Sequence, residues 1–157
     1  MQPVPSLIVP TQGEPLLLPC AVVAEIVDYT AATPQPGAPL WLMGFAPWRD
    51  LTIPVVSFEA VLGAPAVTVA ETAKLVVLNI LREQSPVGFY GLVAAGSPRL
   101  VQINEKNLTS REDSDQSEDF LLHEVLIRGD PARVPDLVAL ESMLLGYLSG
   151  REAPAAV

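Results

Sequence analysis

The chain has 157 residues, half of them hydrophobic, and its eighteen acidic and nine basic residues give a net charge of −9. Because disorder needs low hydrophobicity and high charge, this composition excludes a disordered chain. The acid excess also argues against an electrostatic nucleic-acid binder, which needs a basic face. Sixteen prolines, roughly twice the ordinary usage, disfavour a helical bundle. The length predicts a single domain.

A membrane-spanning segment is not expected. Residues 29–48 carry no charge and are long enough to cross a bilayer, but they contain four prolines and two glycines that would break a lipid-exposed helix. The N-terminus, MQPVPSLIVP, has no basic residue before its apolar stretch, so no secretory signal is expected. The single cysteine, Cys20, cannot close an internal disulfide, which favours the cytoplasm.

Apolar segments rich in Val, Ile and Leu recur along the chain and predict an all-β fold. Helices of three or more turns fit only the proline-free stretches 66–85, 99–130 and 136–153. The run LVVLNIL at 75–81 predicts a strand buried on both faces. The ten predicted strands are Ser6–Val9, Pro15–Pro19, Val22–Val27, Trp41–Trp48, Leu51–Val56, Lys74–Leu81, Val87–Val93, Arg99–Ile103, Leu121–Ile127 and roughly Ala132–Val138.

Two segments 82 residues apart resemble one another: VSFEAVL at 56–62 and VALESML at 138–144. Each predicts a strand end followed by a short amphipathic helix with an acid, Glu59 or Glu141, in its first turn. Gly63 and Gly146 are expected to end these helices. The pair predicts two similar halves, each a small barrel or sheet closed by a short helix.

The segment 111–119 reads REDSDQSED and contains five acids and no base in its last eight residues. Its lack of apolar residues predicts a solvated loop. Counted from Asp113, the segment partly imitates a calcium-binding loop. However, Glu118 occupies the position where the sharp turn needs glycine, which argues against calcium.

No catalytic, cofactor or metal site is predicted. The only histidine, His123, lies in a strand-like run without an orienting partner in sequence, and one His with one Cys cannot supply a zinc site. Phosphate-binding and nucleophile-elbow motifs are absent. A Cys–His nucleophile pair would require Cys20 and His123 to meet in space, and Cys20 reads more simply as a small buried apolar residue.

Arg49 is the only basic residue in the first 73 and stands at a tight turn between two apolar segments. In the simpler interpretation it is a surface turn residue that pairs with Asp50 or water. A guanidinium also recognises carboxylate or carbonyl groups in a planar, bidentate manner, which suits a protein contact.

Several short motifs follow one another in the first half of the chain: a V-x-E-I segment, a Pro–Gly–x–Pro turn, a glycine leading into a strand, an arginine turn and an isoleucine-proline-valine strand. Their residues are Val23, Glu25, Ile26, Pro36, Gly37, Pro39, Gly44, Arg49, Ile53, Pro54 and Val55. In this order and spacing they resemble CheW-like coupling proteins of bacterial chemosensory systems. The resemblance is specific over residues 7–63 and weaker over 74–148, where it includes VPDLVALESML at 134–144.

The resemblance implies two five-stranded β-barrels around a shared apolar core, without an active site or cofactor. The expected organisation is one domain over 1–151, with subdomains of about 14–66 and 74–150, an N-terminal strand that is free to cross over, and a disordered tail at 152–157. The implied role is that of an adaptor that couples the cytoplasmic tip of a chemoreceptor to the regulatory domain of a CheA-type histidine kinase. By position, Val23, Gly44 and Arg49 would contact the receptor. The implied location is cytoplasmic, at polar or membrane-associated receptor arrays.

Four departures from the family pattern favour a divergent branch, such as the accessory adaptors of type IV pilus (twitching motility) systems. Asp50 replaces the glycine that usually follows the arginine, and Ser57 replaces a usual aspartate. The second half is compressed, with LVAAGSP at 92–98 in place of the usual Val-Asp-x-Val strand, and segment 111–119 has no counterpart. The alternative from a different class is a small-molecule-binding or regulatory β-barrel that is not coupled to a kinase.

Overall fold

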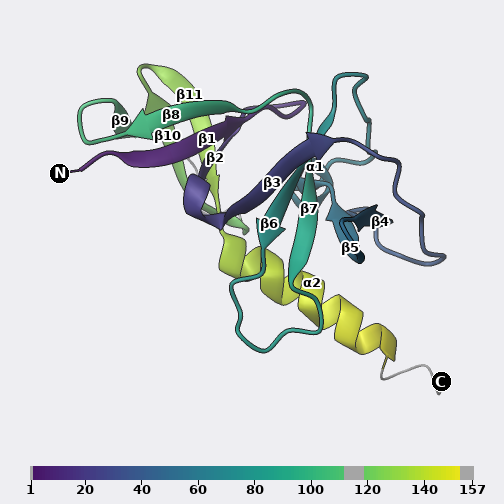
Figure 1. Cartoon of the computed structure of the whole chain (residues 1–157). Coiled ribbons are helices and arrows are strands. Elements are labelled where there is room, and N and C mark those ends of the chain that lie inside the picture. Colours follow the sequence, from purple (N-terminus) through teal and green to yellow (C-terminus); the bar gives the residue numbers. More distant parts are fainter. Residues whose placement is uncertain (1, 112–118, 153–157) are drawn as a thin grey trace.

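A computed structural model of the chain describes residues 2–111 and 119–152. Within them the chain forms two β-sheets, a long C-terminal helix and two short helical turns, which confirms the all-β prediction (Figure 1). The helical elements are the 3-10 turn η1 (Cys20–Val22), α1 (Phe58–Val61) and α2 (Leu137–Glu152). The strands are β1 (Val4–Val9), β2 (Leu16–Pro19), β3 (Val23–Asp28), β4 (Leu42–Trp48), β5 (Leu51–Val56), β6 (Lys74–Asn79), β7 (Phe89–Ala94), β8 (Arg99–Ile103), β9 (Leu108–Ser110), β10 (Leu121–Ile127) and β11 (Asp130–Pro135).

The two sheets have the same internal plan. Sheet A has the order β8-β1-β2-β11-β10-β9, and sheet B has the order β3-β6-β7-β5-β4. In each sheet one pair is parallel, β11 with β2 and β5 with β7, and these pairs occupy matching places. Apart from the extra edge strand β9, each strand of one sheet therefore has an equivalent in the other, which supports the two similar halves inferred from the repeated segments.

The halves of the chain exchange strands. Sheet A combines β1 and β2 with β8 to β11, whereas sheet B combines β3, β4 and β5 with β6 and β7. The two sheets therefore do not coincide with the segments of about 14–66 and 74–150 expected from the sequence. Each half of the chain places its first two strands in the sheet that contains the later strands of the other half. Neither sheet can form from one half alone.

Three apolar clusters hold this arrangement together. The largest lies between the sheets and draws on both of them and both helices, with Leu18, Phe58, Leu92, Leu140 and Leu144 among its buried members. Each sheet also encloses a smaller cluster of its own. Burial of such side chains contributes about 1.5–3 kcal/mol each, so the shared cluster is the main attraction between the two subdomains.

Strand β6 confirms the strand predicted to be buried on both faces. Leu75 and Val77 pack inside sheet B, whereas Val76 and Leu78 face the cluster between the sheets. This strand lies between β3 and β7, so neither of its edges meets solvent.

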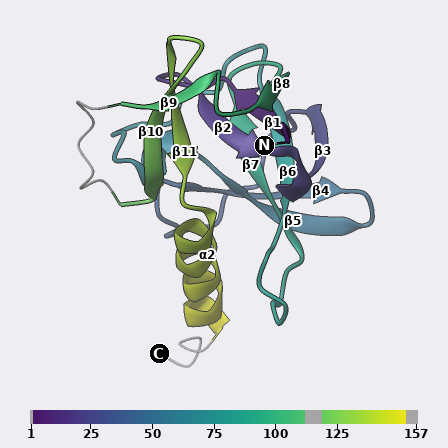
Figure 2. The same cartoon turned by 90° about the vertical axis from the view of Figure 1, so that its left-hand side faces the viewer.

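Two predicted boundaries at the end of the chain are wrong. The strand expected over 132–138 ends at Pro135, because Asp136 caps α2 by accepting a hydrogen bond from the backbone N–H of Ala139 at 3.0 Å. The helix also continues through Gly146 to Glu152. Both views show α2 as one continuous helix (Figures 1 and 2). Its apolar face keeps packing against the shared core through Tyr147, and this offsets the roughly 1 kcal/mol that a glycine costs inside a helix.

The acids of the two repeated segments play equivalent roles. Glu59 on α1 accepts a hydrogen bond from the backbone N–H of Gln12 in the β1–β2 loop of sheet A, at 2.8 Å. Glu141 on α2 accepts from Leu81 and Arg82 in the β6–β7 loop of sheet B, at 2.6 and 3.2 Å. Each helix follows one sheet and holds a loop of the other, so both acids tie the subdomains together.

Replacing the buried acid is expected to be the costlier change. Glu141 is 3% exposed, and Glu141→Ala would leave two backbone N–H groups without their acceptor. We expect a loss of about 2–4 kcal/mol in the free energy of unfolding, measured by urea denaturation. Glu59→Ala is the matched control and should cost less than about 1 kcal/mol, because its single bond is exposed. Equal losses in the two variants would refute this assignment.

Candidate partner-binding surface

The Arg49 turn is a two-residue hairpin between β4 and β5, in which Trp48 pairs with Leu51. Arg49 has a φ of 54°, in the left-handed region that side-chain-bearing residues rarely adopt. Such a conformation costs about 1–2 kcal/mol and persists only where surrounding contacts hold it. The turn therefore presents the arginine in a conformation that needs specific support.

Glu25 on β3 provides that support. Its Oε1 accepts a hydrogen bond from the indole Nε1 of Trp48 at 2.9 Å and lies 3.4 Å from Nη2 of Arg49. The guanidinium carbon of Arg49 also stands 4.4 Å from the centroid of the Trp48 ring. The side chain of Arg49 nevertheless remains 64% exposed. Its guanidinium is thus oriented by a carboxylate and a ring while most of its surface stays open to a partner.

This cluster also joins the two edges of sheet B. Strands β3 and β4 are at opposite ends of the strand order, yet their side chains meet at Glu25 and Trp48. Beyond β3, Thr33 pairs with Phe45 of β4 as an isolated bridge. The sheet is therefore curled, and its closure brings the V-x-E-I segment and the Arg49 turn to one side.

The other two predicted contact residues lie on the same edges. Val23 is half-buried at the start of β3 and packs against the shared core. Gly44 is buried on β4 with a φ of +135°, and a Cβ there would lie 2.1 Å from the carbonyl oxygen of Thr33. Gly44 thus permits the close approach of two chain segments, and it shapes this surface without presenting a side chain.

An exposed apolar residue lies beside the charged cluster. Leu51 pairs with Trp48 across the hairpin and is 47% exposed. Ile26 lies on the opposite face of β3, because it pairs with Val76, which faces the shared core, whereas Glu25 pairs with Val77 inside sheet B. An arginine accompanied by an open apolar side chain is typical of a protein-contact surface. We call Glu25, Trp48, Arg49 and Leu51 the Arg49 surface.

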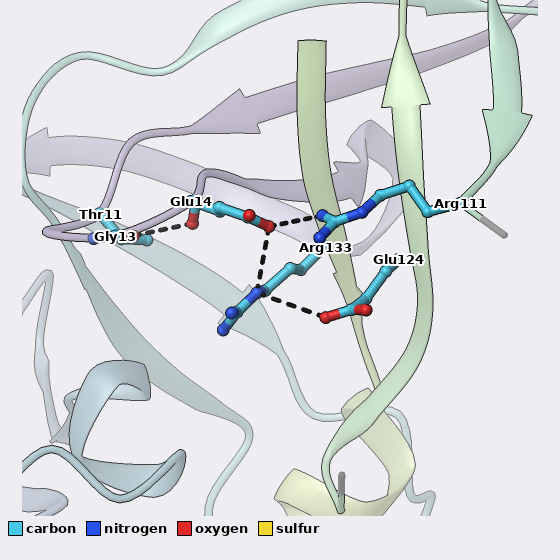
Figure 3. A network of polar contacts seen from close by, with 6 residues as sticks. All are labelled: Thr11, Gly13, Glu14, Arg111, Glu124 and Arg133. Carbon is cyan, nitrogen blue, oxygen red and sulfur yellow. Dashed lines mark hydrogen bonds and ion pairs between the residues drawn. The ribbon is translucent and has the colours of Figure 1, made fainter. Parts of the chain in front are cut away.

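A second polar cluster holds sheet A and is drawn in Figure 3. Glu14, in the β1–β2 loop, accepts from Arg111 at 2.6 Å and from Arg133 at 3.3 Å, and Arg133 is 3.9 Å from Glu124. These residues are all at least two-thirds buried. Sequence patterns gave no sign of this cluster, because its members are up to 119 residues apart.

The cluster predicts a pH dependence of stability. The hydrogen bond from Arg111 holds the pKa of Glu14 below its ordinary value of 4.5, and the charges of Arg111 and Arg133 lower it further against the opposing effect of burial. A carboxylate with a lowered pKa stabilises the fold above the unfolded-state pKa, and this contribution is lost as the pH falls through the folded-state value. Glu14→Gln should therefore cost about 1–2 kcal/mol at pH 7.

The difference between this variant and the wild type should shrink as the pH falls below 4.5 and should vanish once Glu14 is protonated in both states. Urea denaturation of both proteins at pH 7 and at a series of acidic pH values measures this difference. A cost for Glu14→Gln that is independent of pH would contradict this role of the Arg111 pair.

The remaining candidates do not assemble into a catalytic or metal site in the described part of the chain. His123 is exposed on β10, whereas Cys20 is half-buried and packs against the shared core. No group of three or more His, Cys, Asp or Glu residues placed to hold a metal is found among the described residues. The interior of the acidic segment 111–119, including Asp113 and Glu118 of the calcium-loop comparison, lies outside them. No helix of the described chain is long and apolar enough to cross a membrane.

The chain thus consists of two interlocked β subdomains that share one apolar core, with an oriented and exposed arginine on sheet B. A family model described as the CheW-like domain matches residues 5–143, so the chain belongs to the CheW-like family. Members of this family are non-enzymatic scaffolds that act in chemotaxis, which confirms the predictions of family, fold class and absence of enzymatic activity.

Among solved structures, the chain is similar to the scaffolding protein TtCheW from Thermoanaerobacter tengcongensis, with a TM-score of 0.71 and 17% identity. The match covers 87% of this chain and 86% of that one. At this identity the likeness concerns the fold. A comparison with curated proteins finds no match.

Proposed function

We propose that the protein is an adaptor that couples a chemoreceptor to a CheA-type histidine kinase through protein contacts alone. The observation that carries this function is the Arg49 surface, in which Glu25 and Trp48 orient an exposed guanidinium in a chain of the CheW-like family. Orienting a side chain before binding lowers the entropy that association costs, which is the arrangement expected of a contact residue.

The receptor tip is proposed to dock on the Arg49 surface. Arg49 would supply a charged, planar contact and the neighbouring Leu51 an apolar one. Val23 and Gly44 contribute differently, because Val23 is half-buried and Gly44 has no side chain. Their part is to set the shape of the β3 and β4 edges against which the receptor lies.

The kinase contact is tested by calorimetric titration with the regulatory domain of the cognate CheA-type kinase. We expect weak, saturable binding, because modular contacts of this kind are transient and their area does not set their affinity. A regulatory domain that gives no association at high micromolar concentration would contradict the adaptor role.

We further place the protein, as a finer proposal, in the cytoplasm at receptor arrays of a type IV pilus system. The support is the departure from the usual Arg–Gly turn, since Asp50 puts a carboxylate beside the contact arginine. Ser57 is a milder departure, because it caps α1 by accepting from the N–H of Ala60, as an aspartate would. Deletion in the native cell should impair twitching and leave swimming unchanged. The opposite phenotype would overturn this placement.

A further inference from the structure

A cavity of about 210 Å³ opens at one end of sheet A, remote in the topology from the Arg49 surface. Strands β1, β8, β10 and β11 supply its walls, and apolar residues supply most of its lining. The lining residues are Ile8, Pro15, Arg99, Val101, Ile127, Arg128, Asp130, Pro131 and Ala132.

Two arginines share this cavity. Arg99 and Arg128 are both exposed, and neither has an ion pair within the described residues. By contrast Arg49, Lys74, Arg111 and Arg133 all pair with carboxylates. In a chain of net charge −9, a cavity that gathers two unpaired guanidinium groups is a local concentration of positive charge.

The backbone holds one of these arginines in place. Arg128 and Gly129 form the β10–β11 hairpin turn, both with positive φ, and the N–H of Arg128 donates to the carbonyl of Asn107 at 2.9 Å. This turn occupies the place in sheet A that the Arg49 turn occupies in sheet B. Arg49 is held by a carboxylate of its own sheet, Glu25. Arg128 lacks such a partner in the described chain, so its guanidinium group is available to a carboxylate of another molecule.

The size and charge of the cavity select the ligand. Sites for drug-sized ligands measure about 300–1,000 Å³, so this one suits a single apolar side chain. Asp130 also lines it and reduces its formal charge from two to one, which favours a monoanion over a phosphate dianion. An apolar floor beside guanidinium groups therefore fits an apolar residue that carries a carboxylate.

A second hollow of about 290 Å³ continues from the cavity and shares Ile8, Pro15 and Arg99 with it. It runs past Pro10 and Gly13 toward Ser97, and it gives room for further residues next to the carboxylate-bearing one. A free small acid would fill the first cavity only. A peptide with an apolar last residue would fill both.

We propose that this cavity binds the C-terminal residue of a peptide, with its apolar side chain on the Ile8–Ile127 floor and its carboxylate at Arg99 and Arg128. The preceding residues lie in the adjoining hollow. The site is separate from the Arg49 surface and does not depend on the adaptor role. It gives the scaffold a place to hold the end of another chain.

The test is an NMR titration of the ¹⁵N-labelled full chain with the peptide acetyl-Gly-Ala-Ala-Leu as free acid, as C-terminal amide, and with N-acetyl-leucine. The free acid should shift the amide signals of Ile8, Arg99 and the 127–132 turn and bind at least about tenfold more tightly than the amide. N-acetyl-leucine should bind more weakly than the peptide acid, since it leaves the second hollow empty.

Arg99→Gln and Arg128→Gln should each weaken binding of the free acid by about fivefold or more, whereas Arg82→Gln, the same charge change on the β6–β7 loop, should not. The dispersion of each variant's spectrum verifies its fold. Equal binding of acid and amide, unchanged binding in both arginine variants, or no shifts at millimolar peptide would overturn the proposal. N-acetyl-leucine binding as tightly as the peptide would overturn the assignment to a peptide end.

Discussion

Replacing Arg49 with glutamate is expected to weaken binding to the receptor tip by about 30- to 150-fold, the equivalent of about 2–3 kcal/mol. The change removes the exposed guanidinium and places a second carboxylate beside Glu25, so that a surface offering a cation would offer two anions. Binding of the purified chain to a receptor-tip fragment, measured by calorimetry, gives the ratio of dissociation constants.

Stability should change far less than binding. The exposed Arg49–Glu25 pair and the contact with Trp48 are each worth about 1 kcal/mol or less, and the strained turn itself persists in the variant. The matched control is Arg82→Glu, which makes the same charge change on the exposed β6–β7 loop. Receptor binding should survive in the control. Equal losses of binding in the two variants would show that net charge, and not the Arg49 surface, governs the contact.

Replacing Gly44 with alanine is expected to cost about 3 kcal/mol or more in the free energy of unfolding. The added Cβ would lie 2.1 Å from the carbonyl oxygen of Thr33 and 2.9 Å from the Cα of Pro34, and backbone atoms cannot turn aside as a flexible side chain can. The bridge between Thr33 and Phe45 would have to open, so the sheet B edge beside the Arg49 surface would loosen. Urea denaturation measures the loss.

Gly37→Ala separates the two contributions to that cost. Gly37 also has a positive φ, +78°, but a Cβ there would meet nothing within 4 Å, so only the backbone strain of about 1 kcal/mol remains. A Gly44→Ala variant that is no less stable than Gly37→Ala would contradict the close approach. It would also restore Gly44 as a direct receptor contact rather than a residue that shapes the surface.

Local sequence patterns predicted most of the strands, because a buried strand requires apolar residues at regular positions. The unbroken apolar run of β6 follows from burial on both of its faces, and the short helix after β5 follows from its amphipathic spacing and the acid Glu59 in its first turn. Strand β9 escaped prediction because its three residues lie at the sheet edge, and two of them are exposed polar residues. The end of α2 was wrongly predicted at Gly146, because tertiary packing outweighed the low helix propensity of glycine.

Contacts between residues far apart in the sequence could not be predicted from local patterns. The exchange of strands between the halves and the joining of Glu14 to Arg133 depend on residues that meet only in the folded chain. The same is true of Arg49. The sequence placed it at a turn with Asp50 as its expected partner, but the structure pairs it with Glu25 on the opposite edge strand. Glu25 was visible only as part of a family motif, without its role as the acceptor that orients the arginine.

Retention of the kinase on an immobilised receptor tip, with and without the protein, tests the adaptor role most directly. The regulatory domain of the kinase should stay on the receptor tip only when the protein is present. The Arg49→Glu variant should abolish this retention while still binding the kinase domain in solution. Retention of the kinase to the same extent without the protein, or undiminished retention with Arg49→Glu, would contradict it.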